Sequence, residues 1–89
     1  MKTGIGALVI TRDEEEDLEA CLRSLAFCDE RVVVDSFSTD ATVEIACRHA
    51  EHVVRRTFVD FAEQKDFGLR CLSTPWALVV DADERVGVE

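Results

Sequence analysis

The sequence predicts an α/β fold with a doubly wound, parallel sheet of strand order 3-2-1-4. Short apolar stretches rich in β-branched residues alternate with stretches of helical period, so the element order is β-α-β-α-β-α-β. Right-handed helical crossovers between parallel strands are the usual way to build this order. We therefore expect residues 1–89 to form one domain with helices on both faces of the sheet and the first and fourth strands side by side.

Four apolar stretches are predicted strands. They are short, and they lack the strict polar alternation of a strand exposed on one face, which is typical of strands buried in a parallel sheet. The predicted strands are residues 5–10, 31–34, 53–55 and 76–80.

The first predicted helix covers about residues 14–26. Its apolar residues recur at the spacing of one buried face, and Thr11 and Glu14 have the spacing of a capping box. The acidic run 14–17 is then interpreted as a solvated first turn, because negative charge there suits the helix dipole.

Two further helices are predicted by the same periodicity. The second follows Asp40 and ends near residue 50, and the third covers about residues 60–72, ending before Pro75.

The four cysteines are predicted to be free thiols on buried helix faces. Cys21, Cys47 and Cys71 share helical spacings with apolar neighbours, and the sequence has no C-x-x-C pair. Disulfides are therefore not expected. A zinc site on Cys47, His49 and His52 is disfavoured because no second pair of ligands lies nearby.

The charge balance excludes one class of partner. Ten basic and nineteen acidic residues give a net charge of −9, whereas nucleic-acid binding needs a basic face. The longest apolar run, residues 4–10, is too short to span a bilayer and is not followed by a signal-peptide cleavage site. We expect a cytoplasmic protein that does not bind nucleic acid.

Polar residues follow three of the predicted strands. In doubly wound sheets, ligands bind outside the carboxyl ends of the strands at the point where the strand order reverses. The residues expected at this crevice are Thr11, Arg12, Asp13, Asp35, Ser36, Asp81 and Asp83.

The D-x-D pair Asp81 and Asp83 suggests a divalent metal. Two carboxylates just beyond a buried strand can share Mg²⁺ or Mn²⁺, with ligand phosphates completing the coordination shell. Neither a P-loop motif nor a glycine-rich turn after the first strand is present, because Gly4 and Gly6 come at its start. Phosphates would therefore be held by the metal and by a cation such as Lys65.

Three segments together resemble the family-2 inverting glycosyltransferases of the GT-A fold. They are GALVITRDE (6–14), VVVDSFSTD (32–40) and LVVDADE (78–84), in the order and spacing of that family and over nearly the whole chain. DSFSTD (35–40) followed by FAEQKDF (61–67) is similar to a bacterial branch of lipopolysaccharide-core glucosyltransferases.

The resemblance implies a nucleotide-diphospho-sugar donor, with a UDP-sugar expected, and Mn²⁺ or Mg²⁺ as cofactor. It implies that Asp83 is the main metal ligand and that Asp81 lies beside it, near the ribose and diphosphate. It also implies that Lys65 faces the diphosphate. The nucleoside would contact Thr11, Arg12, Glu14, Asp35 and Ser36.

Two positions depart from the family pattern. Ser36 stands where the family often has a second Asp that reads uracil, and Asp66 stands where an Asn usually follows the basic residue. Ser36 therefore affects the expected specificity for uridine, and Asp66 affects the expected binding of the diphosphate.

The resemblance also implies that relatives continue past this chain into an acceptor-binding region that carries the general base. Residues 1–89 are therefore expected to be the N-terminal nucleotide-sugar-binding portion of a hexosyltransferase, inactive alone and without an assignable catalytic residue. The saccharide acceptor, in lipopolysaccharide or another envelope glycan, would contact the missing portion, and the full-length enzyme could lie at the inner membrane. The exposed edge of strand 76–80 predicts a homo-oligomer.

Two alternatives remain open from the sequence. A haloacid-dehalogenase-like phosphatase also has a D-x-D after a strand, but it normally has Thr or Val where Arg85 stands, and its motif opens the domain. The other alternative is a non-catalytic domain that binds nucleotide.

Overall fold

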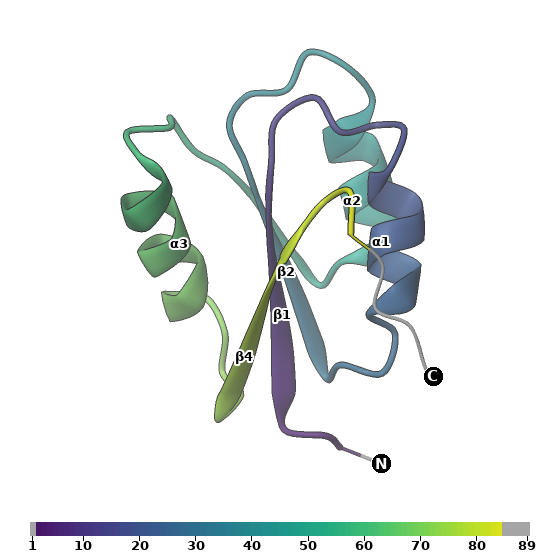
Figure 1. Cartoon of the computed structure of the whole chain (residues 1–89), viewed down its shortest axis with the longest axis vertical. Helices are drawn as coiled ribbons and strands as arrows, with labels where there is room; N and C mark the ends of the chain where they lie inside the picture. Colours follow the sequence, from purple (N-terminus) through teal and green to yellow (C-terminus); the bar gives the residue numbers. More distant parts are fainter. Residues whose placement is uncertain (1, 85–89) are drawn as a thin grey trace.

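The computed structural model describes residues 2–84 as a four-stranded sheet between two helical layers (Figure 1). Arg85, which bears on the phosphatase alternative, lies outside the described residues. The elements are β1 (Ile5–Thr11), α1 (Leu18–Ser24), β2 (Glu30–Asp35), α2 (Thr42–His49), β3 (His52–Arg55), α3 (Phe61–Arg70) and β4 (Trp76–Asp81).

The predicted sheet topology is confirmed. The strands are all parallel in the order β3-β2-β1-β4. In this register Thr11 lies opposite Asp35, and Ile10 lies opposite Asp81. The carboxyl ends of β1, β2 and β4 therefore meet at one edge of the sheet, which we call the carboxyl edge.

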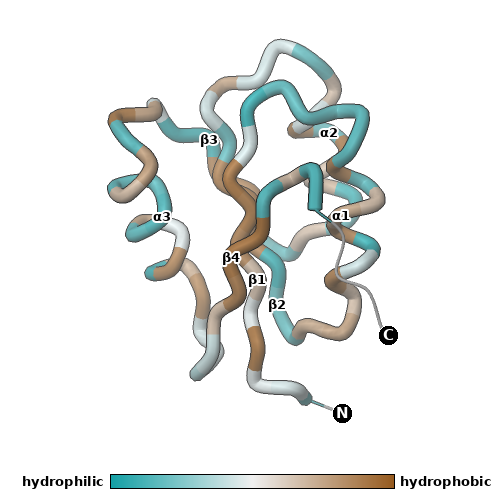
Figure 2. The backbone as a smooth tube through the Cα atoms, in the orientation of Figure 1, coloured by the Kyte–Doolittle hydropathy of each residue, from teal (hydrophilic) through white to brown (hydrophobic). Residues whose placement is uncertain are grey.

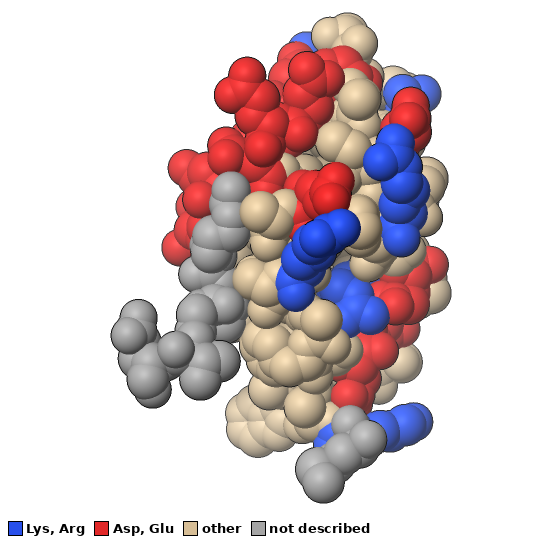
Figure 3. Space-filling model, turned by 90° about the vertical axis from the view of Figure 1, so that its right-hand side faces the viewer, with Lys and Arg blue, Asp and Glu red and all other residues tan. Residues whose placement is uncertain are grey.

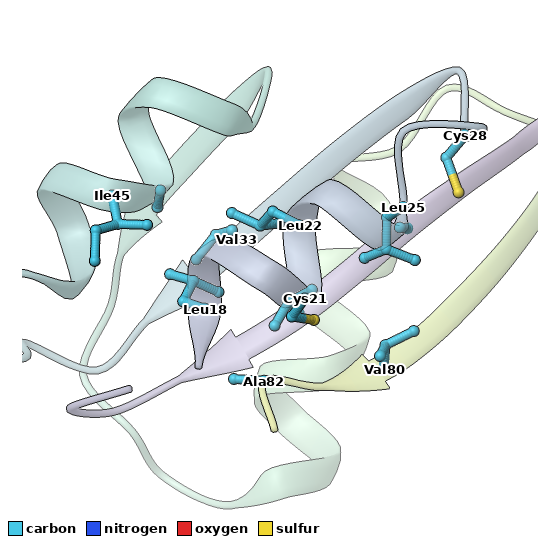
Figure 4. Close-up of a cluster of buried hydrophobic side chains, with 12 residues drawn as sticks. Leu18, Cys21, Leu22, Leu25, Cys28, Val33, Ile45, Val80 and Ala82 are labelled. Carbon is cyan, nitrogen blue, oxygen red and sulfur yellow. The ribbon is translucent and has the colours of Figure 1, made fainter. Parts of the chain in front are cut away.

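Each face of the sheet has its own apolar core. Helices α1 and α2 cover one face and α3 covers the other, while the apolar residues concentrate in the central strands (Figures 1 and 2). Side chains of α1 point onto Val33 and Val80 of the sheet, and Ile45 of α2 joins them (Figure 4). Burying one such side chain stabilises the fold by about 1.5–3 kcal/mol.

The α3 face is thinner, and Gly68 explains how the helix approaches the sheet. A Cβ atom at this position would lie 2.3 Å from Cδ1 of Leu8, which is fully buried in β1. Only a residue without a side chain lets α3 pack this closely over β1.

The predicted start of the first helix is wrong. Thr11 is the last residue of β1, and its hydroxyl donates to Asp35 rather than capping a helix. Residues 15–17 form a turn, and the helix begins at Leu18, without a side-chain hydrogen bond at its N-cap. Within the acidic run, Glu14 is half-buried, so the interpretation of a fully solvated turn does not hold for it.

The expected burial of the cysteines is only partly right. All four thiols are free, and Cys21 is buried as predicted, but Cys47 is exposed. The buried face of α2 is formed by Thr42, Ile45 and Ala46, so the next residue along the helix points outward.

Within residues 2–84, no helix is long and apolar enough to cross a membrane.

Candidate donor-nucleotide site

Asp35 ties together the ends of β1 and β2. Its fully buried carboxylate accepts hydrogen bonds from the Thr11 hydroxyl at 2.7 Å, from the Ser38 backbone at 2.8 Å and from the Ser38 hydroxyl at 2.5 Å. These bonds enclose the carboxylate. Asp35 is therefore placed to position Thr11 and the loop after β2.

The loops after β1 and β2 interlock. The Asp13 backbone donates to the Ser38 hydroxyl at 2.8 Å, and the Asp13 carboxylate accepts from the Thr39 backbone at 2.8 Å. Asp13 and Phe37 have φ angles of 54° and 55°, a left-handed conformation that costs a non-glycine residue about 1–3 kcal/mol. The two strained residues both lie at the carboxyl edge, where the interlock holds them.

A pocket of about 370 Å³ opens at this edge. Thr11, Arg12, Glu14 and Ser36, four of the predicted site residues, line it together. The remaining lining residues are Ile10, Phe58 and Phe61. Sequence reasoning missed the two phenylalanines, although aromatic residues between the end of β3 and the first turn of α3 were an available signal.

Gln64 of α3 is a second residue that sequence reasoning missed. Its side chain is fully buried, and its Nε2 donates to the Ser36 hydroxyl at 3.1 Å and lies 3.5 Å from the Arg56 carbonyl oxygen. A glutamine within a helix carries no sequence signal for this contact, because its partner is 28 residues away.

The acidic pair lies beside the pocket. Asp81 and Asp83 are exposed at the end of β4, and the Asp81 backbone donates to the Glu84 carboxylate at 2.7 Å. Partial burial raises the pKa of the Glu14 carboxyl, and the negative charges of Asp83, Asp17, Asp40 and Asp81 raise it further. Acidic side chains gather toward the end of the molecule where the carboxyl edge lies (Figure 3). The edge is therefore strongly negative without a cation.

The donor set fits a hard divalent cation that is shared with a ligand. Asp81 and Asp83 offer the carboxylate oxygens that Mg²⁺ and Mn²⁺ prefer. Residues 2–84 contain no group of three or more His, Cys, Asp or Glu side chains arranged to hold a metal. A cation on these two residues would therefore take further oxygens from phosphate or water.

Lys65 does not line the pocket. It is exposed on α3 and borders a separate depression with Ala62, Asp66 and Leu69. Its contact with a diphosphate stays a prediction.

Sequence comparisons identify relatives across almost the whole chain. The profile of Glycosyl transferase family 2 matches residues 7–87. The lipopolysaccharide core biosynthesis glycosyltransferase LpsC of Rhizobium meliloti is 36% identical over 96% of this chain and 33% of its own length. An uncharacterized glycosyltransferase of Rickettsia bellii is 37% identical over 96% of this chain and 29% of its own length.

Solved structures share the fold. Staphylococcus aureus TarS (1–349) matches with a TM-score of 0.77 and 27% identity, covering 96% of this chain and 28% of TarS. Glucosyl-3-phosphoglycerate synthase from Mycobacterium tuberculosis, in complex with Mn²⁺, UDP and glucosyl-3-phosphoglycerate, matches with a TM-score of 0.75 and 24% identity. That match covers 88% of this chain and 33% of the synthase.

The chain spans about a third of the length of the curated relatives it matches. The match nevertheless covers most of the chain, and it rejects the phosphatase alternative. The four-stranded parallel sheet agrees with it. The chain belongs to glycosyl transferase family 2.

Proposed function

We propose that this chain is the donor-binding region of a glycosyltransferase and binds a nucleotide-diphospho-sugar together with Mn²⁺ or Mg²⁺. The observation that carries the proposal is the sheet register. It sets Thr11 opposite Asp35 and Ile10 opposite Asp81, so the pocket and the acidic pair share one edge. The fold accommodates such ligands, since the mycobacterial synthase was solved with Mn²⁺ and UDP.

The chemistry of transfer assigns distinct tasks to these residues. As the acceptor oxygen bonds to the anomeric carbon, the bond from that carbon to the diphosphate oxygen breaks, and the electron pair leaves with the diphosphate. A divalent cation held there would stabilise the growing negative charge. Asp81 and Asp83 would hold the cation, while Thr11, Arg12 and Ser36 would hold the nucleoside. The described residues supply no assignable base for the acceptor, so we expect no transfer by this chain alone.

We propose a saccharide acceptor, in lipopolysaccharide or a related envelope glycan. The support is LpsC, which is named for lipopolysaccharide core biosynthesis and is 36% identical over 96% of this chain.

Metal-dependent nucleotide binding tests the proposal. UDP is titrated into the 89-residue chain with and without Mg²⁺, which is diamagnetic, while backbone amide shifts are followed. We expect shifts near Thr11, Ser36 and Asp83 only with Mg²⁺, because the bare carboxyl edge repels a diphosphate. Asp83→Asn should abolish the metal dependence. Glu16→Gln removes the same charge from an exposed turn and should retain it. Equal binding by wild type and Asp83→Asn would refute the metal assignment.

We also propose that the chain self-associates through β4. Among residues 2–84 this strand pairs only with β1, and the Trp76 side chain is 71% exposed beside a groove of about 390 Å³ that Thr3, Ile5, Ala77 and Leu78 complete. An apolar edge without Lys or Pro favours pairing with another strand. Light scattering at high concentration should show dimers or larger species, and Trp76→Lys should reduce the mass to that of a monomer. A monodisperse wild-type monomer would refute this proposal.

A further inference from the structure

We propose that Ala82, the middle residue of the D-x-D pair, and Cys21 of α1 are positioning residues that hold the turn carrying Asp81 and Asp83. We call these two residues the anchor. The inference rests on the proposed function and deepens it, because it says what orients the two carboxylates before a metal binds. Ala82 has no donor atom and Cys21 is fully buried in the core, so both act through the two aspartates.

Ala82 continues the alternation of β4 beyond the last residue of the strand. Leu78 and Val80 pack in the core under α1, whereas Val79 packs in the core under α3. Ala82 is 3% exposed and belongs to the α1 core (Figure 4). Because successive side chains of a strand point to opposite faces, Asp81 is directed to the α3 face of the sheet.

The pocket lies on that same face. Ile10 is opposite Asp81 in the register, packs in the α3 core and lines the pocket together with Phe61 of α3. Asp81 and Asp83 both remain exposed. Burial of the Ala82 methyl under α1 therefore directs the Asp81 carboxylate away from the α1 core and toward the side where the pocket opens.

Two hydrogen bonds close the turn itself. The Asp81 carbonyl oxygen accepts from the Glu84 backbone at 2.9 Å, and the Asp81 backbone donates to the Glu84 carboxylate at 2.7 Å. Both bonds lie within residues 81–84. They set the shape of the turn, but they do not set its place against α1.

Cys21 joins the turn to α1. Its Sγ lies 3.6 Å from the Asp81 carbonyl oxygen, which thus receives a second donor from another element of the fold. The thiol is a weak donor, but the Cys21 side chain also packs in the same core cluster as Ala82. Helix α1 therefore holds the turn by apolar packing and by a hydrogen bond.

Orientation of the ligands before binding favours metal affinity, because ligands that must be ordered during binding lose conformational entropy. Replacing residues that orient metal ligands typically costs about 10- to 100-fold in affinity. We therefore expect loss of the anchor to weaken Mg²⁺ binding even though both aspartates remain.

The main test measures the affinity of the 89-residue chain for Mg²⁺ at a fixed UDP concentration, from the amide shifts of Asp81 and Asp83. Ala82→Gly removes the buried methyl and should weaken Mg²⁺ binding about 10-fold. Ala77→Gly makes the same change at an exposed position of β4 and should keep the wild-type affinity. Amide relaxation without ligand should show increased mobility at Asp83 in Ala82→Gly and not in Ala77→Gly.

A second set of variants tests the thiol. Cys21→Ala removes the donor and should weaken Mg²⁺ binding about 3-fold, the size expected for one weak hydrogen bond. Cys21→Ser restores a donor and should recover the wild-type affinity. Cys28→Ala removes a thiol from the same core away from Ala82 (Figure 4) and should leave the affinity unchanged. If Cys21→Ser does not fold, the comparison of Cys21→Ala with Cys28→Ala decides.

The outcomes separate this inference from the proposed function. If the wild type does not bind UDP and Mg²⁺ together, the proposed function fails, and unchanged Asp83 mobility in Ala82→Gly would then overturn the anchor as well. If the wild type binds both ligands, wild-type Mg²⁺ affinity in Ala82→Gly overturns the positioning role. Equal weakening in Ala82→Gly and Ala77→Gly also overturns it, because loss of stability alone would then explain the effect.

Discussion

The carboxylates at the amino edge of the sheet differ from three of the carboxylates at its carboxyl edge. At the amino edge, Asp29 accepts from the backbones of Thr3 and Gly4 at 2.8 Å each, and Glu30 accepts from the Ser73 backbone at 2.8 Å. At the carboxyl edge, no group among residues 2–84 donates a hydrogen bond to the carboxylates of Glu14, Asp81 or Asp83. Internal donors thus use the first set to join chain segments, while the second set stays available to a ligand.

The pKa shifts follow internal hydrogen bonding. At the carboxyl edge, the hydrogen bond from the Thr42 side chain lowers the pKa of Asp40 in the loop after β2. Backbone hydrogen bonds from Thr3 and Gly4 lower the pKa of the Asp29 carboxyl. The Ser73 backbone and the His52 side chain lower the pKa of Glu30. At the other edge, partial burial and neighbouring negative charges raise the pKa of Glu14. The comparison teaches that carboxylates bonded by internal donors join chain segments at both edges, whereas Glu14, Asp81 and Asp83 at the carboxyl edge accept no such bond within residues 2–84.

The largest expected effect concerns Asp35, whose carboxylate at the carboxyl edge is bonded by internal donors. Asp35→Ala leaves the buried donors of Thr11 and Ser38 without an acceptor, and it should lower the free energy of unfolding by about 3 kcal/mol. Urea denaturation measures this change. Asp66→Ala, which removes an exposed carboxylate from α3, should cost less than about 0.5 kcal/mol. If the two losses are alike, Asp35 does not join β1 to β2 as described.

A smaller effect is expected at the amino edge. Glu30 joins β2 to β3 through His52 at 2.9 Å and to the loop before β4 through Ser73. Glu30→Gln weakens these charge-assisted bonds and should lower the free energy of unfolding by about 1 kcal/mol. UDP binding with Mn²⁺ should not change, because Glu30 lies at the opposite edge. Weaker binding by this variant would show that the two edges are coupled.

The smallest expected effect is on the pH dependence of stability, to which Glu30 and Glu14 contribute with opposite signs. Glu30 has a lowered pKa in the folded state, so its contribution to stability is present above pH 4.5, its ordinary value, and is lost as the pH falls through the folded value. Glu14 has a raised pKa, so its ionisation costs stability as the pH rises above 4.5. Glu14→Gln should therefore stabilise the chain at pH 7 by about 0.5 kcal/mol or less.

Thermal unfolding from pH 3 to pH 7 separates the two cases. The gain from Glu14→Gln should shrink as the pH falls, and the loss from Glu30→Gln should shrink over the same range. Parallel pH profiles for the two variants would contradict the division between the edges.

Local patterns in the sequence predicted the strands well, because buried parallel strands are continuous runs of β-branched residues such as Val32, Val33 and Val34. The start of the first helix was misplaced because the Thr11 hydroxyl donates to Asp35, 24 residues away. No local sequence pattern predicts that hydrogen bond. The same reason hid Gln64, whose contact with Ser36 exists only once α3 packs on the sheet.

The candidate site was predictable to the extent that its residues follow strands directly. Thr11, Arg12 and Ser36 were found because a parallel sheet brings strand ends together, whereas Glu14 was named only by the family resemblance. Phe58 and Phe61 lie beyond β3, at the edge of the sheet, and their place in the pocket depends on the path of the loop into α3.

The interlock of Asp13 with Ser38 and Thr39 has a consequence for the thermodynamics of binding. Two loops that would otherwise fluctuate separately are joined before any ligand is present, so their ordering entropy is lost during folding and not during association. A nucleotide then meets walls that are already rigid. Calorimetry should accordingly find little unfavourable conformational entropy for UDP in the wild type and a larger unfavourable entropy in Asp13→Ala, with the base contacts unchanged.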